Sequence, residues 1–454
     1  MPLTNTLPQT DKLIRHYIER YRRSQKPIAV SFKKTLKQLN YGDRYTHLIH
    51  SYPAKLLMHI PYFFLNNNIF SKKGDYVLDP FCGTGTVLLE SMLAERKGLG
   101  ADSNPLARLI TEVKTEKYDK EELLSHLEII IERSKKYKTA KVPDVVNIDH
   151  WFPKKTQNDL SKILRAINTI RPNKIRSFFL VCFSNCIKKV SFADPRIAVP
   201  VKLNPDRFKN DPKKYEDVKK HLQKVKRINV ISKFKAIAIQ NIDRINRLNT
   251  EKKTRYKAKI ISDDARKLKA SKKSKARFKS RSVQLVITSP PYAGAQKYIR
   301  SSSLNLGWTG LAKTNELLQL DKKNIGRENY RSDELKIKKT GIEKADLLIQ
   351  QIASIDIVRA KIIAQYLIEM KAAINESIRV LKKDGYFVLV VGNNKVCNKE
   401  FTTQRYLTEY IESKGLKRVF KLIDDIKSYG LMTKRNKTAD IISREWILVF
   451  KKSK

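Results

Sequence analysis

Two glycines that follow a short apolar run are the first residues whose spacing suggests chemistry. Gly83 and Gly85 stand in the segment DPFCGTG, residues 79–85, directly before a stretch with helical spacing of apolar residues. Glycine lets a backbone turn tightly beside a ligand, and the N–H groups that open a helix point at the same place. Asp102 follows at the end of a second short apolar run, where a carboxylate could accept both hydroxyls of a ribose. A tight turn with a helix cap is the alternative interpretation.

A second group of residues could hold a flat ring that carries an amine. TSPPY, residues 288–292, ends an apolar run. Two prolines stiffen the backbone and leave carbonyls without neighbouring N–H groups, Ser289 adds a neutral hydrogen-bonding group, and Tyr292 adds a π surface. Such a turn could accept hydrogen bonds from an exocyclic amine of a base taken out of its stack. A plain proline turn is the alternative.

The charge of the chain narrows the class of partner. In 454 residues there are 94 Lys and Arg against 45 Asp and Glu, a formal net charge of +49. A field of this size favours a polyanion, most simply a nucleic acid. No apolar run is long enough for a membrane span, so we expect no membrane partner. Four cysteines fit a reducing cytoplasm, and with no His or Cys cluster beside Cys182 and Cys186 we expect buried thiols and no metal.

These motifs need elements that position them, and the pattern of the chain predicts strands alternating with helices. Apolar strand runs are expected at 76–78, 258–268, 283–292, 386–394 and 444–450. Strands that alternate with helices indicate a parallel sheet covered by helices on both faces, with ligands at the carboxyl ends of the strands. Residues 116–255 instead hold helical runs and many basic residues.

The two motifs together resemble those of DNA amino-methyltransferases that depend on S-adenosylmethionine, of the cytosine-N4 type. DPFCGTGT resembles the cofactor motif of that family and TSPPY its catalytic motif. The resemblance implies a Rossmann-like α/β methyltransferase fold with a mostly parallel seven-stranded sheet, helices on both faces, and a mainly helical insertion. It covers roughly residues 40–115 and 255–454.

From this we predict four parts of the chain. Residues 1–40 are expected to be a basic N-terminal helical extension, and 41–115 the first part of the catalytic domain with the cofactor motifs. Residues 116–255 would be a helical basic insertion and the candidate target-recognition region, although 309–360 could also serve. Residues 256–454 would be the second part of the catalytic domain, with the SPPY motif.

The resemblance also implies roles for individual residues. The catalytic set is Ser289, Pro290, Pro291 and Tyr292. The segment 46–56 resembles the part that closes over the methionine end of S-adenosylmethionine, GADSNPLA matches the ribose-binding acid, and SDDARKL resembles the acid that recognises the adenine amine. The expected cofactor-binding residues are His50, Tyr52, Lys55, Asp79, Pro80, Phe81, Gly83, Gly85, Thr86, Asp102, Asp264 and Ala265.

Basic residues on either side of the catalytic motif are the expected contacts to double-stranded DNA. A lysine-rich segment between the last two motifs is either a track for phosphates or a solvated loop, and the residues after TSPPY could touch phosphate or base. The predicted set is Lys272, Lys273, Lys275, Arg277, Lys297 and Arg300, with Gln296 as a further candidate.

The resemblance implies a site-specific methyltransferase acting on the 4-amino group of cytosine after base flipping, the modification enzyme of a restriction-modification system. A separately acting restriction endonuclease is the protein partner that such a role would imply. Adenine-N6 methylation of DNA and guanine-N2 methylation of RNA are the alternatives; family members that act on adenine mostly carry Asp where Ser289 stands. A third alternative is a non-catalytic nucleic-acid-binding protein, against which the intact motifs argue.

Overall fold

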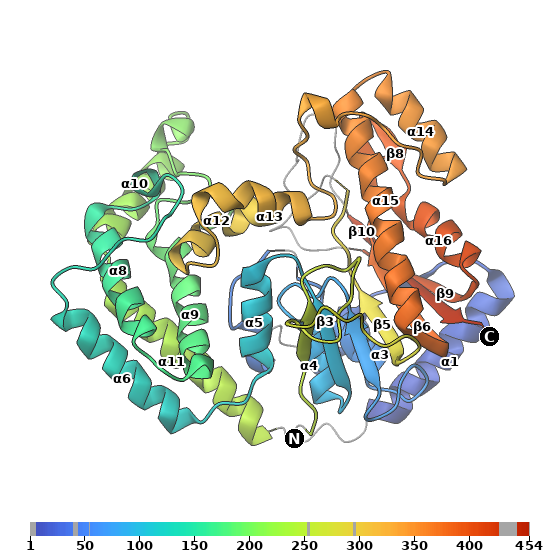
Figure 1. Ribbon diagram of the computed structural model, residues 1–454, viewed down its shortest axis with the longest axis horizontal. Helices are drawn as coiled ribbons and strands as arrows, with labels where there is room; N and C mark the ends of the chain where they lie inside the picture. The colour runs from blue at the N-terminus through green and yellow to red at the C-terminus, as the bar shows by residue number, and fades with distance from the viewer. Residues whose placement is uncertain are drawn as a thin grey trace.

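An eight-stranded sheet forms the centre of one half of the molecule (Figure 1). The computed structural model describes residues 6–39, 44–53, 55–251, 255–293, 297–425 and 443–453. The strands lie in the order β1-β9-β10-β6-β5-β2-β3-β4, and β7 and β8 form a separate hairpin. Their bounds are β1 (Ile28–Val30), β2 (Tyr76–Asp79), β3 (Lys97–Ala101), β4 (Lys259–Ser262), β5 (Val283–Thr288), β6 (Leu381–Val391), β7 (Asn394–Val396), β8 (Lys399–Phe401), β9 (Leu416–Asp425) and β10 (Arg444–Lys452).

The sheet is mostly parallel, and this puts the ends of four strands at one edge. Five adjacent strands of the sheet run parallel to one another, in the order β4-β3-β2-β5-β6. The next strand, β10, runs antiparallel to both of its neighbours, β6 and β9. Residues that come directly after β2, β3, β4 and β5 therefore meet along the carboxyl edge. Because β10 is reversed, its first residues lie at this same edge.

The predicted number of seven strands is wrong, since the described residues form eight in the main sheet. The additional strand is β1, which pairs in parallel with β9 and lies in the part expected to be a helical extension. Ile28 is buried, while Ala29 is exposed. Three residues are too few to produce the alternating pattern by which a strand is detected in a sequence.

Helices cover both faces of the sheet because its apolar side chains alternate in direction. Leu78, Val286 and Leu389 face a core shared with α14 to α16, whereas Val77 and Ile287 face a core shared with α1, α3 and α4. These and the associated helices are α1 (Thr6–Ser24), α2 (Phe32–Thr35), α3 (His59–Leu65), α4 (Thr86–Leu93), α5 (Pro105–Thr115), α14 (Glu343–Ala353), α15 (Ile357–Val380) and α16 (Thr403–Ser413).

The residues between α5 and β4 form a group of helices, the helical group, at one side of the sheet (Figure 1). It is joined by α12 and α13, which follow the turn predicted to be catalytic, residues 289–292, called the catalytic turn below. The bounds are α6 (Lys120–Lys136), α7 (Ile148–Trp151), α8 (Lys154–Asn168), α9 (Asn173–Ile187), α10 (Pro212–Arg227), α11 (Val230–Glu251), α12 (Tyr298–Trp308) and α13 (Leu317–Lys323). The short 3-10 helices are η1 (Lys37–Leu39), η2 (Tyr45–Leu48), η3 (Lys188–Val190), η4 (Pro205–Phe208), η5 (Thr314–Glu316) and η6 (Ser332–Glu334). The domain boundaries given above stay predictions.

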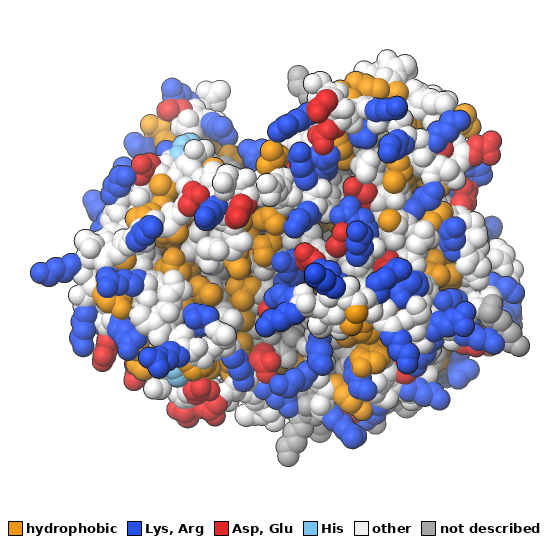
Figure 2. All heavy atoms as spheres, in the orientation of Figure 1, with side chains coloured by type: hydrophobic (Ala, Val, Ile, Leu, Met, Phe, Trp, Pro, Cys, Tyr) orange, Lys and Arg blue, Asp and Glu red, His pale blue; other side chains and the backbone are white. Residues whose placement is uncertain are grey.

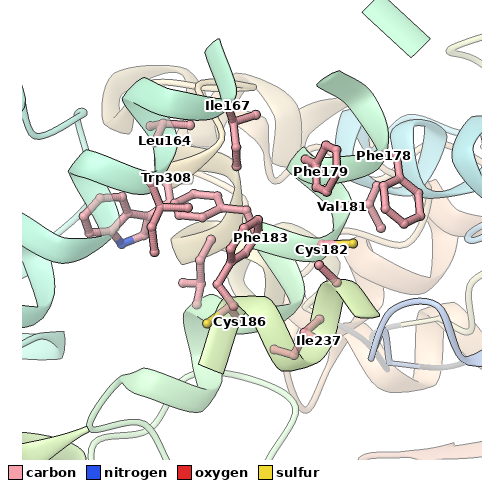
Figure 3. Packing of buried hydrophobic residues seen from close by; sticks show 14 of the residues in the cluster. Leu164, Ile167, Phe178, Phe179, Val181, Cys182, Phe183, Cys186, Ile237 and Trp308 are labelled. Carbon is pink, nitrogen blue, oxygen red and sulfur yellow. The ribbon is translucent and has the colours of Figure 1, made fainter. Parts of the chain in front are cut away.

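A separate hydrophobic core holds this helical group together (Figure 3). Trp308 at the end of α12 is fully buried and packs edge-on against Phe152 and Phe183, with ring centroids 5.6 and 6.2 Å apart. Cys182 and Cys186 of α9 lie in the same core as free thiols. The helix that follows the catalytic turn is thereby fixed to the helical group.

None of the helices in the described part of the chain is long and apolar enough to cross a membrane. In the same part of the chain, no three or more His, Cys, Asp or Glu side chains gather as they would around a metal ion.

The turn that holds Gly83 and Gly85, called the glycine turn below, leads to a prediction about the stability of the protein. Gly85 has φ +75°, and a Cβ there would lie 2.6 Å from Cγ2 of Thr111. Gly415 has φ +83° and open space around its missing Cβ, so Gly415→Ala reports the backbone strain alone. We expect Gly85→Ala to lower the free energy of unfolding by about 1–3 kcal/mol more than Gly415→Ala, measured by urea denaturation. Equal losses in the two variants would contradict the packing at Gly85.

Candidate active site

The predicted motifs meet in one cleft at the carboxyl edge of the sheet, which we call the main cleft. It encloses about 650 Å³, the open mouth included. The turns after β2, β3, β4 and β5 all contribute to it. Its lining residues are Tyr52, Pro80, Phe81, Gly83, Asp102, Ser103, Asn104, Asp264, Ala265, Ser289, Pro291, Tyr298, Lys323, Asn324 and Ile325.

A smaller adjoining space, the inner pocket, continues from the main cleft beneath the glycine turn. The two share Tyr52, Phe81, Gly83 and Ser289. The inner pocket is lined in addition by Lys55, Leu56, Asp79, Cys82, Thr84 and Thr86. The structure therefore brings together most of the predicted cofactor residues with two of the catalytic set.

Asp102 and the glycine turn are joined by direct hydrogen bonds. The backbone N–H of Gly83 donates to Oδ2 of Asp102 over 2.9 Å, and the N–H of Asn104 donates to Oδ1 over 2.8 Å. Burial nevertheless raises the pKa of Asp102. Each carboxylate oxygen retains a lone pair, so the group can still accept hydrogen bonds from a ligand in the cleft.

Asp79 links the glycine turn to the catalytic strand. The hydroxyl of Thr288, at the end of β5, donates to Oδ1 of Asp79 over 2.6 Å, and the N–H of Phe81 donates to the same oxygen over 3.1 Å. Burial raises the pKa of Asp79 to about 7 although both hydrogen bonds act to lower it. The ends of β2 and β5 are thus fixed to each other directly beneath the cleft.

The segment before the glycine turn closes one wall of the inner pocket. Its start is fixed by Glu90 of α4, which pairs with Arg44 at 3.0 Å and with His47 at 2.8 Å. Further along, Lys55 donates to the carbonyl of His47 over 3.2 Å and to that of His50 over 2.5 Å. Burial lowers the pKa of Lys55 to about 8. The cation is thereby held at the wall of the pocket.

His50 lies outside both spaces, unlike its predicted partners Tyr52 and Lys55. Its Nε2 is 3.0 Å from Oγ of Ser184 in α9, and burial lowers its pKa to about 3. The ring is a neutral contact between this segment and the helical group. Gly85 also lies outside the lining and shapes the turn from behind.

Asp264 and Ala265 line the main cleft, opposite the glycine turn. Asp264 accepts two hydrogen bonds from the guanidinium of Arg266, over 2.8 and 3.2 Å. Arg266 also lies 3.4 Å from Glu369 of α15. The predicted adenine-binding carboxylate is therefore held in a fixed orientation by its neighbour, with lone pairs left for a ligand.

The catalytic turn presents only part of its predicted set to the cleft. Ser289 and Pro291 line it, whereas Pro290 is buried behind them. The hydroxyl of Tyr292 donates to Oε1 of Glu445 over 2.8 Å. Tyr292 is thus bound at its hydroxyl end beneath the turn.

The basic residues predicted to touch DNA fall into two places. The basic arm, residues 267–281, lies along the C-terminal half of α15: Arg277 pairs with Glu376, and Lys272 lies 3.0 Å from Glu112 near the end of α5. Its last residue, Arg281, bonds the carbonyl of Arg379 at the amino end of the sheet. The arm therefore runs away from the cleft, and Lys273 and Lys275 are exposed at its tip.

Lys297 and Arg300 lie beside the cleft instead. They line a neighbouring pocket that shares Asn324 and Ile325 with the main cleft, and Lys297 is 3.3 Å from Glu328. Gln296 lies outside the described residues. Figure 2 shows Lys and Arg side chains over both halves of this face and a hollow between the helical group and the region of α14 and α15.

Several residues of the site could not be identified from the sequence as members of it. Asn324 is buried and hydrogen-bonds Ser103 across the cleft. Asn104 donates to the hydroxyl of Tyr52 and to Oγ of Ser302, over 3.0 Å in each case. Glu445 contacts the catalytic turn from the last strand. Only Asn104 had a detectable feature, as the helix cap before a proline.

Comparison with known proteins agrees with this geometry. Residues 52–112 match the N6_N4_Mtase family, described as DNA methylase. The chain is 24% identical over 439 residues to the Type II methyltransferase M.MvaI of Kocuria varians, spanning 90% of this chain and 92% of that protein. It is 33% identical over 94 residues, 21% of this chain and 17% of the other, to the Type II methyltransferase M.MjaII of Methanocaldococcus jannaschii. These matches support a DNA methyltransferase.

Among solved structures, a Thermus thermophilus protein assigned provisionally as a DNA modification methylase aligns with 39% of this chain. The alignment has a TM-score of 0.20 and 19% identity, and this chain spans about half of that one, 49%.

The pKa of Asp79 generates a prediction for stability against pH. Because the folded pKa is about 7 and the ordinary value 3.8, ionisation of Asp79 opposes folding: its stabilisation is complete below pH 3.8 and is lost as pH rises through about 7. Between pH 5 and pH 8 the wild type should lose about 2–3 kcal/mol more than Asp79→Asn, measured by urea denaturation. Asp384→Asn, on the surface, controls for the change in net charge. Parallel curves for wild type and Asp79→Asn would contradict the prediction.

Proposed function

We propose that this protein transfers a methyl group from S-adenosylmethionine to the exocyclic 4-amino group of cytosine in DNA. One observation carries the proposal: Ser289 of the catalytic turn lines both spaces that Gly83 of the glycine turn lines. A donor seated on the glycine turn and an amine held at Ser289 would meet there. Such proximity supplies much of the rate of a direct transfer.

The residues of the two spaces suit the proposed cofactor. The inner pocket offers the Lys55 ammonium and the hydroxyl of Thr84, which is buried without a hydrogen-bond partner among the described residues. These groups fit the carboxylate and amine of the methionine end. Asp102 would accept from the ribose hydroxyls and Asp264 from the adenine amine. When bound, S-adenosylmethionine supplies an electrophilic methyl group on a positively charged sulfur.

In the proposed reaction the protein contributes hydrogen-bond acceptors for the amine of the target base. The lone pair of the cytosine amine is delocalised into the ring, and hydrogen bonds from its N–H groups to Ser289 and to the carbonyl of Pro290 would make it more nucleophilic. A covalent route is disfavoured because burial raises the pKa of Cys82, the thiol nearest the cleft, well above its ordinary value. Serine rather than aspartate at 289 is the feature that favours cytosine over adenine.

The deciding experiment is incubation of the purified protein with DNA and labelled S-adenosylmethionine, followed by nucleoside analysis. The proposal requires 4-methylcytosine. Recovery of 6-methyladenine would move the target to adenine and keep the site, whereas methylation of RNA alone would overturn DNA as the substrate. Protection of the methylated DNA against restriction endonucleases would test the proposed restriction-modification role.

Ser289→Ala should lower kcat about a hundredfold, because one preorganised hydrogen-bond acceptor is lost at the reacting amine. The dissociation constant of S-adenosylmethionine, measured by calorimetry, should change less than twofold. Ser303→Ala, on the surface of α12, is the matched control. A loss of cofactor affinity as large as the loss of kcat would place Ser289 in the wrong role.

Salt dependence of DNA binding distinguishes the two basic regions. Removing a side chain that neutralises one phosphate lowers the slope of log K against log salt by about one. We expect Lys297→Ala with Arg300→Ala to lower the slope by about two, since both residues lie beside the cleft. Lys272→Ala with Lys275→Ala should lower it less, because the basic arm runs to the opposite edge of the sheet. The reverse order would identify the arm as the DNA-binding element.

A further inference from the structure

Asn324 places a buried amide in the wall of the main cleft, although no sequence motif includes it. It is the residue directly after α13, and its backbone N–H donates to the carbonyl of Asp321 over 3.0 Å. The residue is only 8% exposed, yet it lines both the main cleft and the neighbouring pocket that holds Lys297 and Arg300. A polar side chain buried in this way needs a partner at each end of its amide.

The oxygen of this amide has a partner within the protein. The hydroxyl of Ser103 donates to Oδ1 of Asn324 over 2.5 Å, from the loop after β3 to the end of α13. The two residues meet across the cleft, and both belong to its lining. Because the carboxamide is planar, a bond at its oxygen also fixes the direction in which its NH₂ group points.

The nitrogen of the amide has no such partner. It carries two protons, and no residue that the structure describes accepts either of them. The nitrogen is not among the unpartnered side-chain atoms that are sealed within the described residues, so part of it remains accessible. Since the rest of Asn324 is buried, this accessible donor faces the spaces that the residue lines. A ligand with an acceptor at that point would complete the hydrogen bonding of the amide.

The groups around this amide indicate which ligand faces it. Ser103 follows Asp102, the carboxylate proposed for the ribose. Next to the amide in the chain, the carbonyl of Lys323 accepts from Arg266 over 3.3 Å. Arg266 in turn orients Asp264, the carboxylate proposed for the adenine amine. The amide therefore lies between the positions proposed for the ribose and for the adenine amine. Between these positions an adenine carries ring nitrogens that accept hydrogen bonds.

We propose that Asn324 is a further cofactor-binding residue, whose NH₂ group donates to a ring nitrogen of the adenine of S-adenosylmethionine. The inference rests on the proposed function, because it adds a contact to the site assigned there to that cofactor. Asp264 accepts from the amine of the adenine, and Asn324 donates to its ring. Together they match the donor and the acceptors of the base, which neither residue could do alone.

Binding of S-adenosylhomocysteine, the cofactor without its methyl group, tests the contact without any turnover. Asn324→Asp keeps an oxygen for Ser103 and puts a second oxygen where the NH₂ group stood. Asn324→Leu removes both ends of the amide and adds no charge. We expect both variants to raise the dissociation constant, measured by calorimetry, about tenfold or more, because a ring nitrogen loses its donor. Asn315→Asp, exposed on η5 and outside the lining of the cleft, is the matched control and should stay within twofold of wild type.

Analogues of S-adenosylhomocysteine separate a direct contact from a structural role. In three of them N1, N3 or N7 of the adenine is replaced by C–H, which accepts no hydrogen bond. One of the three should bind wild type about tenfold more weakly than the parent compound does. The same analogue should bind Asn324→Leu within twofold of the parent compound, because a contact that is already absent cannot be lost again. A fall in melting temperature does not affect this comparison, since the two compounds are compared within one variant.

Two results would overturn the inference and leave the proposed function standing. The first is an unchanged dissociation constant in Asn324→Asp and Asn324→Leu. The second is that no analogue loses affinity for wild type, or that every such loss persists in Asn324→Leu, which would make Asn324 a structural residue. If wild type has no measurable affinity for S-adenosylhomocysteine, the proposed function fails and takes this inference with it.

Discussion

The hydrogen bond between Thr288 and Asp79 joins the two strands on which the site depends. β2 carries the glycine turn and β5 the Ser-Pro-Pro-Tyr turn, and these strands are neighbours in the sheet although some two hundred residues separate them in the chain. At 2.6 Å this buried contact fixes both turns at one height above the sheet. Ionisation of the buried Asp79 carboxyl lowers the free energy of unfolding. The residue that aligns the two turns therefore reduces the stability of the fold at neutral pH. A site that sets two loops against each other needs such a fixed contact, because transfer between their ligands falls steeply with small displacements.

The distribution of charge separates the two ligands of the proposed reaction. The chain carries a formal net charge of +49, yet the cleft is lined by Asp102 and Asp264, with Asp79 lining the inner pocket. A cationic surface attracts a polyanion at long range, whereas the carboxylates act only within the cleft. In the proposed reaction a sulfonium cofactor would gain from those carboxylates, whereas DNA phosphates would meet the cationic surface outside the cleft.

The sequence was informative where chemistry constrains local conformation. Gly83, Asp102 and Ser289 stand at strand ends in short motifs, and the structure places all three in the lining of one cleft. Contacts between distant segments could not be predicted in this way. Glu445 meets Tyr292 only because β10 is inserted in reverse between β6 and β9, and a reversed strand has the same alternation of apolar residues as a parallel one. The direction of the basic arm is likewise set by Glu376 and Glu112, which no local pattern connects to it.

Asn104 is one of the side chains that couple the helical group to the site. Asn104 caps α5 and also donates to Tyr52, before the glycine turn, and to Ser302 of α12. α12 in turn is fixed to the helical core by Trp308, which is fully buried between aromatic rings. A displacement of the helical group therefore reaches the loop after β3 and the wall of the inner pocket through a few short contacts. Because hydrogen bonds of this length tolerate little displacement, a shift of α12 must either move Asn104 with it or break the bond between Asn104 and Ser302. The positions of α12, of the loop after β3 and of the wall of the inner pocket are therefore coupled.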